Sequence, residues 1–153
     1  MAVRAEGLRV PLGREESPKG GVDLEVGFQI SRFQIWRFRA NAEQTLGPAE
    51  GWLKAEAQLQ DAVDLAIDNN IYVLHGNSLE RYFNGTRQNF NLAAVSPSIE
   101  RAQKVFTTPD QQMIYLLEPS AERILIYNKN GRLQNQLKSP KLHDAADLFV
   151  DER

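Results

Sequence analysis

Short runs in which apolar and polar residues alternate follow one another along most of the chain, and turn-forming residues separate them. Alternation with a period of two predicts β-strands that bury one face. We therefore expect an all-β fold with strands at residues 22–26, 33–38, 63–67, 71–74, 79–83, 87–92, 104–107, 113–117, 123–127, 133–137 and 148–150.

The residues between these strands favour tight antiparallel turns. Residues 84–85 and 130–131 are both Asn-Gly, a strong hairpin signal because Asn and Gly tolerate the positive φ angles of short β-turns. Residues 68–70 and 76–77, which are rich in Asp, Asn and Gly, supply two further turns. Consecutive strands are thus expected to pair as antiparallel meanders.

The alternation stops between residues 41 and 60. A Gly-Pro pair interrupts this segment, and Trp52, Ala55 and Leu59 then follow at helical spacing. Two alternatives remain open here: a helix of about two or three turns, or a long loop that packs Trp52 against a sheet face.

The strand pattern repeats with a period of about 44 residues. Residues 35–38 have counterparts at 79–82 and 124–127, and Ile-Tyr-Val-Leu at 71–74 returns as Ile-Tyr-Leu-Leu at 114–117. A period of this length, filled with short strands, is typical of β-propeller blades, each of which is a four-stranded antiparallel meander.

The repeats divide the chain into a tail and about three blade-like units. Residues 1–21 show no periodicity and are rich in Gly and Pro, so we expect a flexible tail or linker. The pattern of residues 61–68 returns late in the chain, where it opens a further copy. The expected units are 22–60 (a degenerate blade), 61–97, 98–141 and the start of another at 142–153.

One unit resembles the blade signature of NHL-type β-propellers. In that family a strand ends in an acidic residue, a polar loop follows, an Arg-aliphatic pair opens the next strand, and an aromatic residue precedes an Asn/Asp-Gly turn. The matching residues are Tyr115-Leu116-Leu117-Glu118, then Arg123-Ile124-Leu125-Ile126-Tyr127, then Asn130-Gly131. In the preceding copy His75 stands where Glu118 stands later, and the copy at 22–60 departs most.

The resemblance implies a β-propeller-like stack of about three blades. Closed propellers have about four to eight blades, so three blades form an incomplete ring. Three explanations remain open: a fragment of a longer chain, half of a six-bladed ring closed by a second copy in a homodimer, or a three-unit stack whose ends the N-terminal tail shields.

Composition narrows the classes of partner. The chain has 153 residues and a formal net charge of −2, so it lacks the basic surplus of nucleic-acid binders. It has no cysteine, which excludes disulfides, thiolate catalysis and cysteine-ligated metals. No apolar run approaches the ~20 residues of a membrane span, and no secretory signal is evident, so we expect no membrane partner and a cytoplasmic location by default.

No residue set predicts catalysis or a cofactor. His75 and His143 lack a second ligand at metal spacing and are interpreted as surface loop residues. The recurring aspartates suggest calcium, but no Asp-x-Asp-x-Asp run gathers the oxygens that calcium needs. The four tyrosines are expected to fill the space between blades. We therefore predict no catalytic residue, metal site or cofactor.

The aspartates are instead interpreted as turn caps and channel residues. Asp68, Asp110 and Asp151 follow first strands, where a carboxylate caps a turn by accepting backbone N–H groups. Asp64 and Asp147 are expected to face the central channel, where they would bind water or a ligand. The candidate binding residues are Asp64, Asp68, Asn70, Asp110, Asp147 and Asp151.

Non-catalytic recognition is the leading functional hypothesis. Loops carry binding while strands carry packing, so the chain is expected to act as a scaffold for protein interaction or ligand recognition. Two alternatives remain open: part of a propeller enzyme or carbohydrate-binding propeller with its ligand in the channel, or a purely structural spacer.

Overall fold

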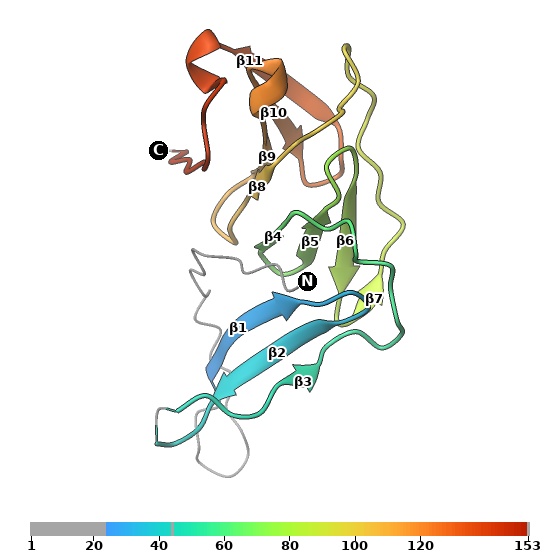
Figure 1. The fold of residues 1–153 in the computed structure, drawn as a ribbon, viewed down its shortest axis with the longest axis vertical. Coiled ribbons are helices and arrows are strands. Elements are labelled where there is room, and N and C mark those ends of the chain that lie inside the picture. Colours follow the sequence, from blue (N-terminus) through green and yellow to red (C-terminus); the bar gives the residue numbers. More distant parts are fainter. Residues whose placement is uncertain (1–23, 44, 153) are drawn as a thin grey trace. The chain divides into compact units, whose positions relative to one another are not determined.

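The computed structural model describes residues 24–43 and 45–152, with side chains from Phe28 onward. This part of the chain is all-β and forms three antiparallel sheets, two of them four-stranded (Figure 1). The predicted tail at 1–21 lies outside the described residues. The described residues divide into two compact units, one made of residues 24–43, 45–60 and 84–86 and the other of residues 61–83 and 87–152.

The first unit contains a three-stranded sheet in the order β1-β2-β3. Its strands are β1 (Leu24–Ile30), β2 (Ile35–Ala40) and the short β3 (Glu50–Gly51). Strand β1 continues beyond the predicted end at residue 26, because a bulge between Glu25 and Gly27 absorbs the irregularity in the pattern. Prediction of a strand at 33–38 was correct to within two residues.

The segment that follows β2 forms a loop and no helix, so the helical alternative was wrong. Its backbone N–H groups bond to the β1–β2 hairpin: Trp52 N donates to Ile35 O at 2.8 Å, and Leu59 N to Arg32 O at 2.9 Å. The indole of Trp52 packs edge-on against Phe28, with ring centroids 5.8 Å apart. The loop alternative, with Trp52 against the sheet, is the one observed.

The first four-stranded sheet is a meander in the order β4-β5-β6-β7. Three of its strands match the prediction: β4 (Asp64–Ile67), β5 (Ile71–Leu74) and β6 (Leu79–Phe83). The predicted strand at 87–92 is wrong beyond its first residue, since β7 covers only Thr86–Arg87. Beyond β7 the chain leaves the sheet edge, and Phe90 packs edge-on against Tyr72 at 5.9 Å between ring centroids.

The second four-stranded sheet is also a meander, in the order β8-β9-β10-β11. Its strands lie where the alternation predicts them: β8 (Lys104–Phe106), β9 (Met113–Glu118), β10 (Arg123–Asn128) and β11 (Leu133–Lys138). Two 3-10 turns, η1 (Pro119–Ala121) and η2 (Pro140–Leu142), complete this region. The predicted strand at 148–150 is not formed.

The two four-stranded sheets share one hydrophobic core. Their first strands, β4 and β8, lie side by side, and side chains from both sheets contribute to the same buried cluster. A small antiparallel sheet cannot bury both faces alone, so it needs such a neighbour. All four tyrosines are buried, and two of them, Tyr72 and Tyr127, belong to this shared core as predicted, whereas Tyr82 and Tyr115 are not part of this cluster.

An ion pair lies inside the second sheet, at the motif that carries the NHL resemblance. Glu118 and Arg123 are each 1% exposed, and Glu118 Oε2 lies 2.8 Å from Arg123 Nε and 2.7 Å from Nη2. The other carboxylate oxygen accepts the backbone N–H groups of Glu100 and Arg101 at 2.8 and 2.9 Å. The guanidinium also donates to the backbone oxygens of Pro97 and Ser98. The pair thereby holds the irregular connection between the two sheets.

Removing the carboxylate charge should destabilise the protein strongly. Burial by itself raises the pKa of Glu118, but the N–H groups of Arg101 and Glu100 and the Arg123 guanidinium lower that pKa further, to below its ordinary value. Glu118→Gln leaves Arg123 buried without a counter-ion, so we expect the free energy of unfolding at pH 7 to fall by about 3 kcal/mol or more, measured by urea denaturation.

The same substitution should change the pH dependence of stability. Because the pKa of Glu118 is lower in the folded state, its contribution is complete above the ordinary carboxyl range and is lost as pH falls through the folded value. The difference between wild type and Glu118→Gln should therefore narrow in acid. Glu100→Gln, at an exposed side chain of the same connection, serves as the control and should cost almost nothing. An equal loss of unfolding free energy in the two variants would show that the buried charge of Glu118 does not stabilise the fold.

The β10–β11 turn lies against the same connection. Gly131 has φ +81°, its carbonyl accepts Ala93 N at 2.7 Å, and a Cβ at this glycine would collide with Asn91 O. Gly76 also has a positive φ, +86°, but a Cβ there would be 4.0 Å from the nearest atom, Glu100 O. An alanine substitution at either glycine therefore introduces backbone strain, whereas only the substitution at Gly131 also introduces a steric clash.

Gly131→Ala should lower the free energy of unfolding by clearly more than Gly76→Ala. The shared cost of an L-residue at positive φ is about 1 kcal/mol, and the Gly131 variant must also displace the connection. Parallel urea titrations of both variants measure the difference. A Gly131→Ala cost no larger than that of Gly76→Ala would mean that the connection does not approach the turn this closely.

Candidate functional site

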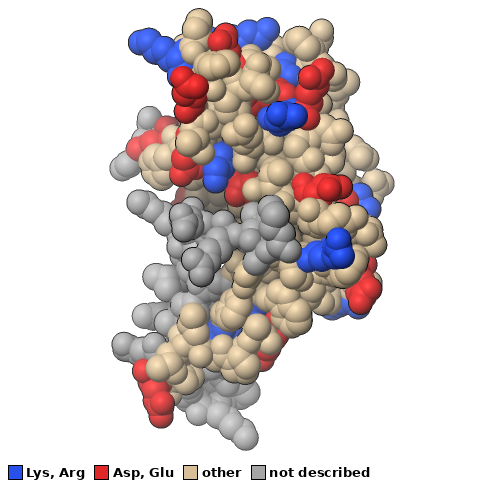
Figure 2. Space-filling view, in the orientation of Figure 1, with Lys and Arg blue, Asp and Glu red and all other residues tan. Residues whose placement is uncertain are grey.

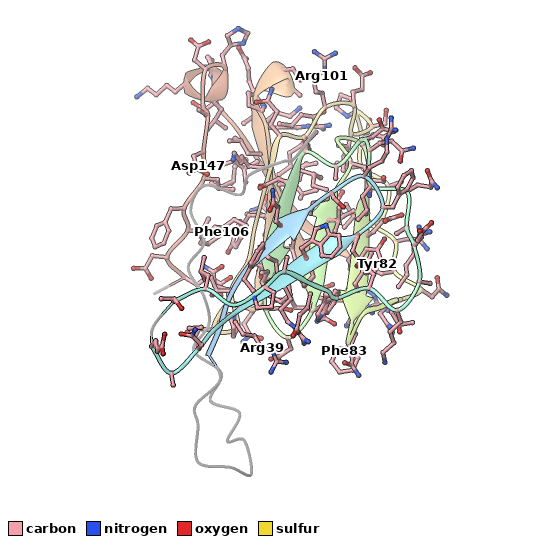
Figure 3. The ribbon with its side chains drawn as sticks, turned by 60° about the horizontal axis from the view of Figure 1, so that its bottom comes forward. Arg39, Tyr82, Phe83, Arg101, Phe106 and Asp147 are labelled. Carbon is pink, nitrogen blue, oxygen red and sulfur yellow. The ribbon has the colours of Figure 1, made fainter. Side chains whose placement is uncertain are left out.

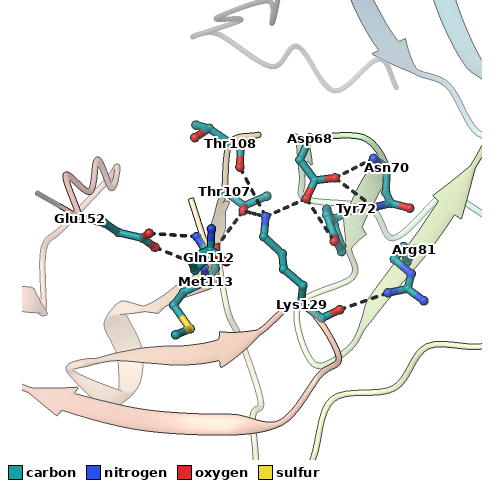
Figure 4. Close-up of polar contacts among 10 residues, drawn as sticks. All are labelled: Asp68, Asn70, Tyr72, Arg81, Thr107, Thr108, Gln112, Met113, Lys129 and Glu152. Carbon is teal, nitrogen blue, oxygen red and sulfur yellow. Dashed lines mark hydrogen bonds and ion pairs between the residues drawn. The ribbon is translucent and has the colours of Figure 1, made fainter. Parts of the chain in front are cut away.

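Three loops and the C-terminal segment meet at one end of the two four-stranded sheets (Figure 4). The loops are the β4–β5 turn (68–70), the β8–β9 loop (107–112) and the β10–β11 turn (129–132), and residues 150–152 join them. We call this set the loop cluster. Four of the six predicted binding residues lie in or beside it: Asp68, Asn70, Asp110 and Asp151.

Lys129 is the central cation of the loop cluster, and it connects the two sheets. Its ammonium group lies 2.7 Å from Asp68 Oδ2, contacts the hydroxyl of Thr107, and donates to Thr108 O at 3.4 Å. Its backbone oxygen accepts Arg81 Nη1 at 3.1 Å. Lys129 was not predicted, because nothing local to its own segment indicates a partner 61 residues away.

Asp68 caps the β4–β5 turn as predicted. Its Oδ1 accepts the backbone N–H of Asn70 at 2.6 Å and the Asn70 side-chain amide at 3.1 Å. The hydroxyl of Tyr72 donates to the other carboxylate oxygen at 3.4 Å. Burial and the charge of Asp68 raise the pKa of Tyr72 to about 12, so this phenol keeps the proton that it donates to Asp68.

Asp64 lies in the interface between the two sheets and not on an open channel wall. Its side chain is buried, and Oδ2 accepts the backbone N–H of Val105 at 2.9 Å, which joins β4 to β8. Burial raises the pKa of Asp64, the Val105 N–H and the charge of Lys104 oppose the rise, and the charge of Asp147 adds to it. The carboxylate therefore has a structural contact with the backbone of the neighbouring sheet, and its expected role in ligand or water binding stays a prediction.

The remaining predicted aspartates are exposed. Asp147 accepts the adjacent Leu148 N–H at 2.8 Å, and its charge acts on Asp64. Asp110 lies exposed in the β8–β9 loop, where Gln111 N closes the turn by donating to Thr108 O at 3.2 Å, and the cap by Asp110 stays a prediction. Asp151 is also exposed, in the segment that contacts this loop.

Glu152, which the sequence did not indicate, anchors the C-terminal segment to the start of β9. Its carboxylate accepts Gln112 N at 2.9 Å, Met113 N at 3.2 Å and the Tyr115 hydroxyl at 2.9 Å. These three donors outweigh the opposing effect of burial and lower the pKa of Glu152. In turn, burial and the Glu152 carboxylate raise the pKa of Tyr115 to about 12. Nearby, Gln111 Nε2 donates to Val150 O at 2.6 Å.

The chemistry of the loop cluster is hydrogen bonding and charge pairing. Among the described residues, no group of three or more His, Cys, Asp or Glu side chains could hold a metal ion.

The two histidines lie outside the loop cluster. His75 Nε2 lies 3.2 Å from Glu80 and His143 Nδ1 lies 3.6 Å from Glu122. His143 is exposed as expected, whereas His75 is half-buried, contrary to its interpretation as a surface residue.

On the face shown in Figure 2, acidic and basic side chains are interspersed, and the blue side chains do not gather into one patch. In the part of the chain that the structure describes, no helix is long and apolar enough to span a membrane.

No family model, curated protein or solved structure matches this chain. The NHL resemblance therefore rests on the quoted residues alone.

The link between Lys129 and Asp68 should be measurable as a coupling energy. Lys129→Met leaves the Asp68 carboxylate, which is 8% exposed, without its cation. Asp68→Asn leaves the Lys129 ammonium group without its anion. A double-mutant cycle of these two substitutions, measured by urea denaturation, should give a coupling of about 1 kcal/mol or more. A coupling near zero would show that the ammonium group does not connect the two sheets.

Proposed function

We propose that the two four-stranded sheets are NHL-like propeller blades and that the chain acts as a non-catalytic recognition scaffold. Each sheet is a meander in chain order, and the first strands lie side by side in one core. The motif residues Glu118 and Arg123 form the pair that holds the connection between the sheets. In this proposal the three-stranded sheet is the degenerate blade at 22–60.

The proposed recognition surface is the loop cluster. The observation that carries it is that hydrogen bonds and an ion pair join these loops and the C-terminal segment to one another, while other polar side chains of the same loops are exposed. Asp68, Lys129 and Glu152 provide the internal bonds. Loops held in this way lose little conformational entropy on binding. The exposed side chains are Asn69, Asp110, Gln112, Asn130 and Arg132.

The loop cluster favours a peptide or protein partner over a reacting substrate. Its exposed groups are amides, carboxylates and one guanidinium, which suit hydrogen bonds with backbone and polar side chains. The enzyme or carbohydrate alternative draws on the raised pKa of Asp64. That carboxylate is buried and bonded to Val105 N, which supports a structural role instead.

A peptide selection tests the proposal. A random displayed-peptide library is panned against the full chain, and binders are measured by thermal shift, where specific binding raises the midpoint by mass action. We expect the triple variant Asn69→Ala, Asp110→Ala, Gln112→Ala to lose at least tenfold in affinity for the selected peptides.

The control variant is Ser120→Ala with Lys141→Ala. These exposed residues lie in η1 and η2, and η1 joins the ends of β9 and β10 that are far from the loop cluster, so the control should bind normally. A midpoint raised by simple sugars, with Asp64→Asn abolishing the rise, would favour the channel-ligand alternative. Peptides that bind both variants equally would place recognition elsewhere.

A further inference from the structure

Among the described residues, the sheet β1-β2-β3 has one strand fewer than the two four-stranded sheets. The repeat indicates which strand position is empty. Strand β2 corresponds to β6 in the repeat, and β1 pairs with β2 as β5 pairs with β6. The sheet β1-β2-β3 therefore has the second, third and fourth strand positions of a meander. Among the residues that the structure describes, no strand pairs with the outer edge of β1, where β4 pairs with β5 in the other sheet.

Residues 147–150 have the sequence of such a first strand but form none. Asp-Leu-Phe-Val at 147–150 corresponds in the repeat to Asp-Leu-Ala-Ile of β4. The segment is held by its end, through Glu152 and through Gln111 to Val150 O. It lies beside β8, where Phe149 contacts Phe106 edge-on at 5.4 Å between ring centroids; Figure 3 labels Phe106 and Asp147 on this side of the second unit.

The exposed fraction of Phe149 also supports the interpretation of this segment as a first strand without its sheet. Phe149 is 67% exposed, whereas its repeat counterpart Ala66 is 8% exposed in β4. A large aromatic ring at a first-strand position is thus largely in water, although the equivalent position in a completed sheet is buried. Pairing this segment with a further sheet would remove apolar surface from water and would also cover an open strand edge.

We infer that residues 147–150 add to the edge of β1 in a second copy of this chain, and that the exchange is reciprocal. The inference rests on the proposed propeller architecture. Two copies of three blades supply six, a number within the range of about four to eight found in closed rings. A reciprocal exchange of one strand is a twofold, self-complementary interface, and its backbone hydrogen bonds are those of strand addition to a sheet edge.

The repeat fixes the register of the exchanged strand. In the first four-stranded sheet Leu65 lies opposite Val73, and Ala66 lies opposite Tyr72. Transferred through the repeat, Leu148 comes opposite Gln29 and Phe149 comes opposite Phe28. Directly opposite residues of an antiparallel pair have Cα atoms about 5 Å apart, within the range that a disulfide spans, whereas a shift of one residue turns the side chain to the other face of the sheet.

Cysteine cross-linking tests this register, because the chain has no cysteine of its own. The single variants Gln29→Cys and Leu148→Cys are mixed in equal amounts and oxidised. We expect a two-chain band on a non-reducing gel that forms in the mixture and not in either variant alone. Light scattering of the wild-type chain should give the mass of two chains.

The matched control mixes Gln29→Cys with Phe149→Cys, which is one residue out of register. It should cross-link at least tenfold less. Equal cross-linking in both mixtures, or none in either, would overturn the inference. A single-chain mass, with a disulfide forming only when both cysteines are in one chain, would assign the strand to the same chain's own sheet and also overturn it.

This failure is distinguishable from failure of the proposed function. The cross-link concerns β1 and the C-terminal segment, whereas peptide recognition is measured with substitutions in the loops. Peptides that bind the loop cluster of a one-chain species would leave the scaffold proposal standing and reject the strand exchange. A specific cross-link between positions 29 and 148 without peptide binding would support the strand exchange and reject the scaffold proposal.

Discussion

The buried pair of Glu118 and Arg123 is the constraint on which the arrangement of the second unit depends. Two charges taken out of water are tolerated only when every donor and acceptor finds a partner. Here the carboxylate takes two backbone N–H groups of the connection, and the guanidinium takes backbone oxygens from Pro97 and Ser98. The connection between the sheets must therefore return to this point. Its course determines where the next strand, β8, begins.

Other carboxylates of the second unit act in the same way on irregular backbone. Asp64 accepts Val105 N, Asp68 accepts Asn70 N, and Glu152 accepts Gln112 N and Met113 N. Short strands leave many turn and linker N–H groups outside the sheet ladders, and buried N–H groups need partners. The recurrence of acidic residues with the repeats therefore reflects the recurrence of such connections. It needs no metal to explain it.

The two four-stranded sheets use different chemistry at equivalent places. Where the later sheet pairs Glu118 with Arg123, the earlier one has His75 opposite Ser78, joined by a backbone hydrogen bond from His75 N to Ser78 O at 2.9 Å. Close to this turn, Glu80 lies 3.2 Å from His75 and 2.8 Å from Arg87. The repeat thus preserves the geometry of the meander while its polar contacts vary. Surface recognition can change on such a frame without loss of the core.

Local sequence determined the strands and turns of this protein. Alternation places side chains on opposite faces whatever the rest of the chain does, and Asn-Gly favours its turn from the conformations of two residues. The strands at 71–74 and 113–117 are continuous apolar runs, and they were predictable because such short runs stand between turn signals. The cap by Asp68 was predictable as well. Prediction failed where a distant partner decides. The helical spacing after Trp52 gave way to hydrogen bonds with the β1–β2 hairpin, and the strand predicted at 87–92 gave way to packing of Phe90 on Tyr72.

The candidate site shows the same division. Asp68 and Asn70 were accessible to sequence reasoning because their bonds are local. Lys129 and Glu152 were not, since their partners lie 61 and about 40 residues away and meet only after the sheets stack. Asp64 was recognised as a first-strand residue, but only the neighbouring sheet decided that its carboxylate binds Val105 N. Periodicity reports which face a residue occupies, whereas the contact across that face depends on the tertiary structure.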